Sequence, residues 1–254
     1  MMILSQDITG AEGPGRGIMT TIYILDIDGT LMPSDEIDNQ CYWQAVERVF
    51  QRSAGDPDLT NYRDVTDTGI LEQWCRENLG RSPKVRETQA IRRRFLELLK
   101  TVHEAEPMAF TPRRGLLGWL QQACDGRATG VAIATGGWEH SARFKLEAAD
   151  LERFRLPLAH SDDAITRVGI MQCALQRVAS KLEPARLPIL PHQVTYVGDG
   201  PWDFEASQAL GWKFVGIATA DKYRKLKDYG ATRVYPDFLE WLRHSSGPAG
   251  SELE

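Results

Sequence analysis

The chain has 254 residues, of which 42% are hydrophobic, so it can bury a proper core, as one large domain or as a core with a smaller insert, without a cofactor to hold it folded. Its 26% of charged residues and formal net charge of -5 are typical of a globular protein and favour neither nucleic acid nor a membrane as partner. The four cysteines are scattered without paired spacing, which argues against disulfides and a zinc site and favours a cytoplasmic location. No apolar run approaches the ~20 residues that span a bilayer, so no membrane span is predicted.

The first strand is predicted just after a glycine-rich flexible leader, which we assign to residues 1–20. From Thr21 to Ile27 the residues are mainly β-branched or apolar, and the run ends in acidic residues and Gly29. This pattern is typical of a buried strand that leads into a loop. The carboxylates of Asp26 and Asp28 are therefore expected at the carboxyl end of a strand.

A helical block without a convincing strand is predicted for residues 34–111. Asp67 is predicted to cap its second helix, and Ser82, followed by Pro83, its third. The arginines at 92–94 are interpreted as a solvated helix face, with a phosphate-facing role as the alternative. Apolar residues recur at helical spacing on three faces, which are Ile37, Cys41, Ala45 and Val49; Ile70, Leu71, Trp74 and Cys75; and Ile91, Phe95, Leu98, Leu99 and Val102.

Short apolar runs and amphipathic helices alternate after Pro112. This alternation predicts an α/β fold, a Rossmann-like parallel sheet with helices on both faces. We therefore expect an α/β core made of residues 21–33 and 112–245, an inserted α-helical cap at 34–111 and a flexible tail at 246–254. The expected strands lie at 130–134, 156–160, 194–197, 213–217 and 232–235, and the expected helices at 114–124, 138–149, 167–182 and 201–211.

Polar residues of complementary types follow the predicted strands. Asp26 and Asp28 follow the first, and Thr135 and Gly136 follow the strand at 130–134. A hydroxyl group and main-chain amides at the start of a helix suit the oxygens of a phosphate. Because ligands of an open parallel sheet bind beyond the carboxyl ends of its strands, these residues are expected to converge.

Two further segments belong to this set. Arg167 comes shortly after the apolar strand candidate at 156–160, and Asp199 and Asp203 follow the strand at 194–197. Several carboxylates at one point need a cation, and a set of oxygen ligands suits Mg²⁺. The sequence thus predicts a magnesium site beside groups that bind phosphate.

Taken together and in this order, these residues resemble the haloacid dehalogenase-like hydrolase superfamily, in its phosphatase branch with a helical cap, similar to phosphoglycolate phosphatases. The resemblance covers residues 21–235. The segment Asp26-Ile27-Asp28-Gly29-Thr30-Leu31 looks like the first motif of the family. Thr135 resembles the second motif, Arg167 the basic third motif, and Asp199 with Asp203 the acidic fourth.

The resemblance implies a role for each of these residues. Asp26 is the expected nucleophile, which forms an aspartyl-phosphate, and Asp28 the expected general acid and base. A dehalogenase needs no proton donor at the second position, so Asp28 favours a small phosphorylated substrate over a halogenated one. Asp26, the main-chain carbonyl of Asp28 and Asp199 are expected to hold Mg²⁺. Thr135, the amide of Gly136 and Arg167 are expected to bind the phosphoryl oxygens. Asp203 is expected to orient Arg167 or a metal-bound water.

Several alternatives stay open. Lys145 and Lys181 are alternatives to Arg167, because many relatives carry a lysine in the third motif. Thr66 and Asp67 either face the substrate or only begin a helix, and Trp138 and Trp202 either line the pocket or pack beside it. Other functions compatible with the motifs are a phosphosugar mutase and a non-catalytic regulatory module that binds phosphate or metal. Neither the identity of the substrate nor the oligomeric state is predicted.

Overall fold

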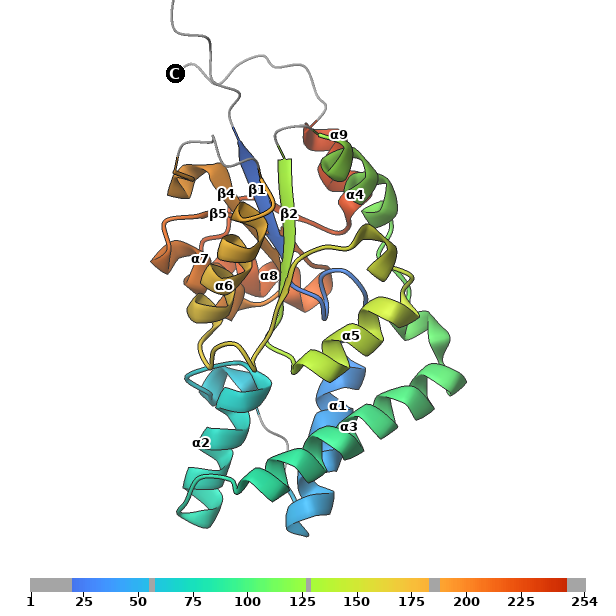
Figure 1. Cartoon of the computed structure of the whole chain (residues 1–254), viewed down its shortest axis with the longest axis vertical. Helices are drawn as coiled ribbons and strands as arrows, with labels where there is room; N and C mark the ends of the chain where they lie inside the picture. Colours follow the sequence, from blue (N-terminus) through green and yellow to red (C-terminus); the bar gives the residue numbers. More distant parts are fainter. Residues whose placement is uncertain (1–19, 55–57, 127–128, 183–187, 246–254) are drawn as a thin grey trace, which may run out of the picture.

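The computed structural model describes residues 20–54, 58–126, 129–182 and 188–245 (Figure 1). The leader predicted at 1–20, except for its last residue, and the tail predicted at 246–254 lie outside these ranges. The described residues form one parallel sheet whose strands are β1 (Thr21–Leu25), β2 (Thr129–Ala134), β3 (Leu158–Ala159), β4 (Val194–Gly198), β5 (Lys213–Ile217) and β6 (Val234–Tyr235). Their order in space is β3-β2-β1-β4-β5-β6, so the first strand lies in the middle of the sheet.

Strand β1 forms the centre of the sheet because both of its faces are apolar. Ile22 and Ile24 belong to the hydrophobic core on one face of the sheet. The side chain of Leu25 points to the opposite face and belongs to the core there. Leu25 pairs with Ile133 of β2 and with Val197 of β4. This register brings the residues that follow the three strands to one edge of the sheet.

Helices cover both faces of the sheet, which confirms the predicted α/β class. On the face of Leu25, the apolar residues come from α4 (Leu116–Asp125), α5 (Glu139–Ala148) and α9 (Phe238–Ser245). On the face of Ile22, they come from α6 (Arg167–Ala179), α7 (Pro201–Ala209) and α8 (Ala220–Asp228). Helices α8 and α9 lie in stretches where the sequence predicted no helix.

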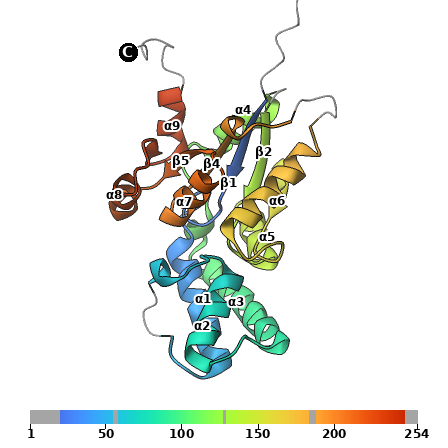
Figure 2. The ribbon, with the colours of Figure 1, turned by 90° about the vertical axis from the view of Figure 1, so that its left-hand side faces the viewer.

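Three helices lie beyond one end of the sheet, as Figures 1 and 2 show: α1 (Asp35–Phe50), α2 (Asp67–Leu79) and α3 (Val85–Ala105). The described residues between 34 and 111 contain no strand, as predicted. The predicted apolar faces are turned inward, and Ala45, Cys75 and Leu99 have no exposed surface at all. The division of the chain into core and cap at residues 33/34 and 111/112 stays a prediction.

The predicted start of α2 at Asp67 is wrong by one residue. The cap is Thr66, whose Oγ1 accepts a hydrogen bond from the amide of Gly69 at 3.0 Å. The carboxylate of Asp67 instead accepts a hydrogen bond from the amide of Trp138 at 2.9 Å, across to the loop after β2. A tertiary contact has therefore taken the side chain that the local pattern assigned to the helix.

The predicted start of α3 is also wrong. Lys84 precedes the first helical residue, and its amide donates a hydrogen bond to the carboxylate of Glu87 at 2.7 Å. Ser82 lies two residues too early to cap this helix, and its hydroxyl donates to Glu72 of α2 at 2.7 Å. The turn before α3 is thus fixed by contacts with both helices that it joins.

Two expectations from composition are tested by the described residues. All four cysteines, Cys41, Cys75, Cys124 and Cys173, are free thiols. No described helix is both long and apolar enough to cross a membrane.

Candidate active site

A cavity of about 230 Å³ lies where the carboxyl ends of β1, β2 and β4 meet the helices α1 and α2. Its wall brings together residues that are far apart in the sequence. Asp203 is fully buried and completes the predicted set from just behind the wall, where it contacts Arg167. The other predicted site residues all line the cavity: Asp26, Asp28, Thr135, Gly136, Arg167 and Asp199. Their chemical roles stay predictions.

Asp26 is held in place by the strand and the helix beside it. Its amide donates a hydrogen bond to the carbonyl of Val197 in β4 at 2.9 Å, and its Oδ1 accepts one from Arg167 Nη1 at 3.0 Å. The side chain is almost completely buried. Burial raises the pKa of Asp26 well above its ordinary value; Arg167 opposes the rise, and the carboxylates of Asp203 and Asp199 add to it.

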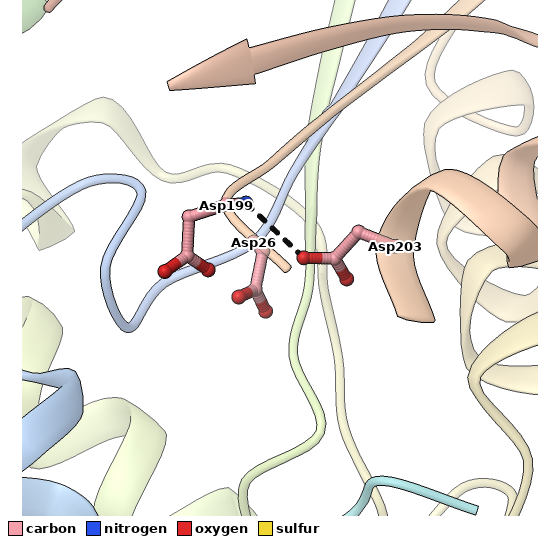
Figure 3. Close-up of side chains that lie close together, drawn as sticks. All are labelled: Asp26, Asp199 and Asp203. Atoms are coloured by element: carbon pink, nitrogen blue, oxygen red, sulfur yellow. Dashed lines mark hydrogen bonds between the residues drawn. The ribbon is translucent and has the colours of Figure 1, made fainter. Parts of the chain in front are cut away.

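Asp199 and Asp203 are positioned by the turn between β4 and α7. One carboxylate oxygen of Asp203 accepts hydrogen bonds from the amides of Asp199 at 3.2 Å and Gly200 at 3.1 Å, and Figure 3 shows the first of these bonds. The other oxygen, Asp203 Oδ1, lies 3.5 Å from Arg167 Nη1 and has no hydrogen-bond partner in the described part of the chain. Asp203 therefore shapes the turn that carries Asp199.

The carboxylates of Asp26, Asp199 and Asp203 form a buried acidic cluster, in which one oxygen of each lies within 4.8 Å of the others (Figure 3). Burial raises the pKa of Asp199 to about 6, with Lys222 opposing the rise and Asp203 adding to it. Mutual repulsion and burial both penalise the ionised carboxylates, and a hard divalent cation would relieve both. The residues present thus fit such an ion. The third carboxylate of the cluster belongs to Asp203, whereas the prediction used the main-chain carbonyl of Asp28.

Gly29 allows the loop after β1 to approach Asp199. Its φ angle is +75°, in the left-handed region that favours glycine, and a Cβ atom at this position would lie 1.9 Å from Asp199 Oδ2. Any other residue would displace the aspartate. The glycine of the first motif therefore makes room for the carboxylate of the fourth.

Asp28 points to a different set of partners. Its Oδ2 lies 2.5 Å from Lys145 Nζ, and its Oδ1 accepts a hydrogen bond from the hydroxyl of Ser34 at 2.6 Å. Lys145 is completely buried and also lies 2.6 Å from Asp38 Oδ1 in α1. Burial alone would lower the pKa of Lys145, but Asp28 and Asp38 outweigh it and raise the pKa above its ordinary value. The ammonium group therefore stays charged between two carboxylates.

Thr135 and Gly136 directly follow β2 and line the cavity. Thr135 is buried, and its Oγ1 accepts a hydrogen bond from the amide of Gly137 at 3.1 Å. The carbonyl of Gly136 accepts a hydrogen bond from the amide of Asp67 at 2.8 Å, which ties the start of α2 to this loop. Burial raises the pKa of Asp67 to about 7; Lys145 and the hydrogen bond from Trp138 oppose the rise.

Lys222 of α8 is a cavity residue that the sequence interpretation missed. Its ammonium group lies 2.5 Å from Asp35 Oδ2 in α1 and also bonds Asp199. Burial lowers its pKa and the two carboxylates raise it, with a net rise above the ordinary value. The available signal was position, since Lys222 follows β5 shortly after its carboxyl end, at the edge where the other site residues gather.

The open alternatives separate clearly in space. Lys181 is exposed and donates to the carbonyl of Arg155, away from the cavity, whereas Lys145 lies beside Asp28. Trp138 is buried and donates from Nε1 to the hydroxyl of Thr68 at 2.9 Å, so it packs between elements. Trp202 lines the cavity, as do Thr66 and Asp67. None of the arginines at 92–94 lines it.

Comparisons with known proteins agree on the family and on the fold. A sequence model described as haloacid dehalogenase-like hydrolase matches residues 23–217. A comparison with curated protein sequences found no significant match. Among solved structures, a hydrolase from Pseudomonas syringae shares 19% identity with a TM-score of 0.66, over 91% of this chain and 100% of the other.

Two further structures are similar at comparable levels. A HAD hydrolase of family IA, variant 3, from Entamoeba histolytica shares 13% identity with a TM-score of 0.63, over 87% of this chain and 95% of the other. CbbY from Rhodobacter sphaeroides, in complex with phosphate, shares 16% identity with a TM-score of 0.66, over 87% of this chain and 96% of the other. At such low sequence identities, these structural similarities show only that the chain shares its fold with these proteins.

Proposed function

We propose that this chain, which belongs to the haloacid dehalogenase-like hydrolase family, is a Mg²⁺-dependent phosphatase that hydrolyses a small phosphorylated metabolite through an aspartyl-phosphate on Asp26. The observation that carries the proposal is the pairing of two carboxylates in one cavity with different surroundings. Asp26 lies in the acidic cluster beside Arg167, and Asp28 lies outside that cluster beside Lys145. A nucleophile and a proton donor need such different environments.

In the first step, a carboxylate oxygen of Asp26 attacks the phosphorus atom, and the bond between phosphorus and the alcohol oxygen breaks. Asp28 gives a proton to that oxygen, so that a neutral alcohol leaves. The phosphoryl oxygens lie against the hydroxyl of Thr135, the amide of Gly136 and the guanidinium group of Arg167. Arg167 is fixed for this task by Asp203, 3.5 Å away.

In the second step, Asp28 takes a proton from a water molecule, which attacks the phosphorus atom of the aspartyl-phosphate. The bond between phosphorus and the oxygen of Asp26 breaks, and inorganic phosphate leaves. The same carboxyl group thus acts first as an acid and then as a base. Contacts with the hydroxyl of Ser34 and with the ammonium group of Lys145 hold its side chain in one orientation for both tasks.

The acidic cluster is the proposed metal site. Asp26, Asp199 and the main-chain carbonyl of Asp28 would hold Mg²⁺, with Asp203 adjoining. When bound, the ion would neutralise negative charge between the nucleophile and the phosphoryl group. The helices α1 to α3 are proposed to act as a cap that keeps bulk water from the reacting atoms.

The direct test compares the unmodified protein with Asp26→Asn and Asp28→Asn on an aryl phosphate, with and without Mg²⁺. We expect release of phosphate that requires Mg²⁺ and is lost in Asp26→Asn, while circular dichroism shows an intact fold. Because an aryl alcohol leaves without a proton, Asp28→Asn is expected to keep more of the first step than Asp26→Asn does. Unchanged turnover in Asp26→Asn would contradict the proposal.

Two further assays separate the alternatives. A phosphosugar mutase would convert a sugar phosphate into its isomer without net release of phosphate. A non-catalytic module would bind phosphate but form no adduct at Asp26 with beryllium fluoride, which mimics a phosphoryl group. A beryllium-fluoride adduct together with phosphate release supports the phosphatase over both.

A further inference from the structure

The wall that α1 and α2 contribute to the cavity carries several acidic side chains. In addition to Asp26, Asp28 and Asp199 at the strand ends, this wall presents Asp35, Glu36 and Asp38 from α1 and Asp67 from α2. In the proposed phosphatase reaction the phosphoryl group lies at the strand ends. The alcohol portion of the substrate therefore lies against the acidic side chains of the two helices.

Every described cation at this cavity is shared between two carboxylates. Arg167 contacts Asp26 at 3.0 Å and Asp203 at 3.5 Å. Lys222 joins Asp35 to Asp199, and Lys145, just behind the wall, joins Asp28 to Asp38. Each cation is thus already engaged by two carboxyl groups of the protein.

This arrangement leaves no cation for a second anionic group on the substrate. A carboxylate or second phosphate on the alcohol portion would approach acidic side chains in a partly buried cavity, where like charges repel more strongly than in water. To gain a partner, it would have to take Lys222 or Lys145 from the carboxylates that they join. Repulsion of this kind is a common source of specificity.

The remaining features of the wall suit a small polar alcohol. Carboxylate oxygens accept hydrogen bonds from hydroxyl and ammonium groups, and Asn39 adds an amide group to the wall. Leu59 and Ile70 contribute apolar surface for the carbon atoms. A volume of about 230 Å³ is below the range usual for drug-sized ligands, so the substrate is compact.

We propose that the substrate is a small phosphomonoester whose alcohol portion carries hydroxyl or amine groups and no second anionic group. This inference rests on the phosphatase activity proposed above. It also sets the chain apart from a phosphosugar mutase, because returning the phosphoryl group to another oxygen of the sugar passes through a bisphosphate. Such an intermediate would have to bring its second phosphate close to the acidic side chains of α1, such as Glu36.

Two pairs of substrates test the inference, because the members of each pair differ mainly in charge. Glycerol 3-phosphate and 3-phosphoglycerate differ in one terminal group, an alcohol or a carboxylate. Fructose 6-phosphate and fructose 1,6-bisphosphate differ in one phosphate. We expect kcat/KM to be ~10-fold or more higher for the first member of each pair. Equal or reversed values in either pair would overturn the inference, even if an aryl phosphate is hydrolysed as proposed.

A charge reversal at the wall tests whether the acidic side chains cause the preference. Glu36 is exposed, and within the described part of the chain its side chain bonds only the amide of Gln40, at 3.4 Å. Glu36→Lys should therefore leave the fold and the strand-end residues unchanged. We expect it to raise kcat/KM for 3-phosphoglycerate relative to glycerol 3-phosphate by ~5-fold. Glu104→Lys, on the exposed surface of α3 and outside the cavity, makes the same change in net charge and should leave the ratio as it was.

Binding to Asp26→Asn separates a failure of this inference from a failure of the proposed activity. In this variant, calorimetry with the two matched pairs measures affinity without turnover. Tighter binding of glycerol 3-phosphate than of 3-phosphoglycerate supports the inference. Tighter binding of the second anion contradicts it whatever the protein does with an aryl phosphate. If neither the substrates nor the aryl phosphate are hydrolysed or bound, the proposed function itself fails.

Discussion

The ammonium group of Lys145 lies 2.5 Å from a carboxylate oxygen of Asp28, although 117 residues separate the two in sequence. The same ammonium group reaches Asp38 at 2.6 Å. A single buried cation thus connects the proposed proton donor, which follows β1, to the first helix of the proposed cap. This connection makes the orientation of Asp28 depend on two helices, α5 with Lys145 and α1 with Asp38.

Lys145→Met should therefore impair both folding and catalysis. Removing Lys145 leaves the carboxylates of Asp28 and Asp38 without their partner. The loss of one partner of a buried ion pair typically lowers the free energy of unfolding by about 3–5 kcal/mol. We also expect kcat to fall by ~10-fold or more with a smaller change in KM, because Asp28 loses its fixed orientation. Urea unfolding and steady-state kinetics measure the two effects.

The double variant Lys145→Met/Asp38→Asn distinguishes these effects. It removes one of the two carboxylates left unpaired, so part of the lost stability should return while kcat stays low. Lys181→Met is the matched control, since Lys181 is exposed and far from the cavity. A wild-type kcat in Lys145→Met would show that Asp28 is oriented without it.

Arg167 should tolerate neither neutral nor charged replacement well. Arg167→Met removes the positive charge beside Asp26 and the proposed phosphoryl oxygens, and we expect kcat/KM to fall by ~100-fold or more. Arg167→Lys keeps the charge but replaces a planar, forked group by a single ammonium, which does not reach Asp26 and Asp203 in the same way. Its activity should lie between those of the other two proteins, and equal activity of lysine and methionine variants would exclude a role for the charge.

Gly29→Ala and Gly80→Ala form a matched pair of variants that tests the close approach of the loop after β1 to Asp199. Both glycines have positive φ angles, +75° and +67°, so alanine strains both by about 1–2 kcal/mol. At Gly80 nothing lies within 4 Å of the added atom, whereas at Gly29 the atom overlaps the carboxylate of Asp199. Only Gly29→Ala should abolish Mg²⁺-dependent activity, and equal activities of the two variants would contradict this reasoning.

The pKa of Asp67 predicts a pH-dependent loss of stability. Because its folded-state pKa is raised to about 7 from 3.8, the folded protein retains this proton at pH values where the unfolded chain has released it. The contribution to the free energy of unfolding is therefore present at low pH and is lost as pH rises from about 4 to about 7. Asp67→Asn has no such proton to lose.

Urea unfolding at pH 4.5 and pH 8 measures this difference. The stability of Asp67→Asn relative to the unmodified protein should increase between the two pH values, by about 3 kcal/mol. The asparagine can still accept the hydrogen bond from the amide of Trp138. A relative stability that does not change with pH would show that Asp67 ionises in the folded protein as it does in the unfolded chain.

Mg²⁺ should raise the melting temperature of the unmodified protein. An ion that binds only the folded state at ~100 times its dissociation constant adds about 2.7 kcal/mol of stability, and it also relieves the repulsion within the acidic cluster. We expect this shift to shrink strongly in Asp199→Asn. Glu205→Gln, on the exposed surface of α7, is the control and should keep the full shift; a full shift in Asp199→Asn would place the ion elsewhere.

The strand-end residues were predictable because two signals coincide there. The apolar run before Asp26 predicts a central strand, and the first motif and Asp199 follow such runs directly. Parallel topology then implies that these residues meet, and the structure places them around one cavity. Predictions of this kind depend only on local pattern and on the general geometry of parallel sheets.

Contacts that depend on tertiary packing could not be predicted in this way. Thr66 and Asp67 are both good helix caps, and only the hydrogen bond from the distant amide of Trp138 takes Asp67 away from that role and leaves it to Thr66. Helix α8 buries a single residue, Leu226, so its apolar pattern is too weak to reveal it. The cavity role of Lys222 was missed together with the helix that carries it.

The central position of β1 also determines when the site can assemble. Ile22 pairs with Gly130 on one side and with Val194 on the other, and the amide of Asp26 bonds the carbonyl of Val197. During synthesis on the ribosome, the segment with Asp26 emerges more than a hundred residues before the two strands that pair with it. Such distant pairings slow folding, and until β4 emerges the apolar faces of β1 are a target for chaperones and for aggregation.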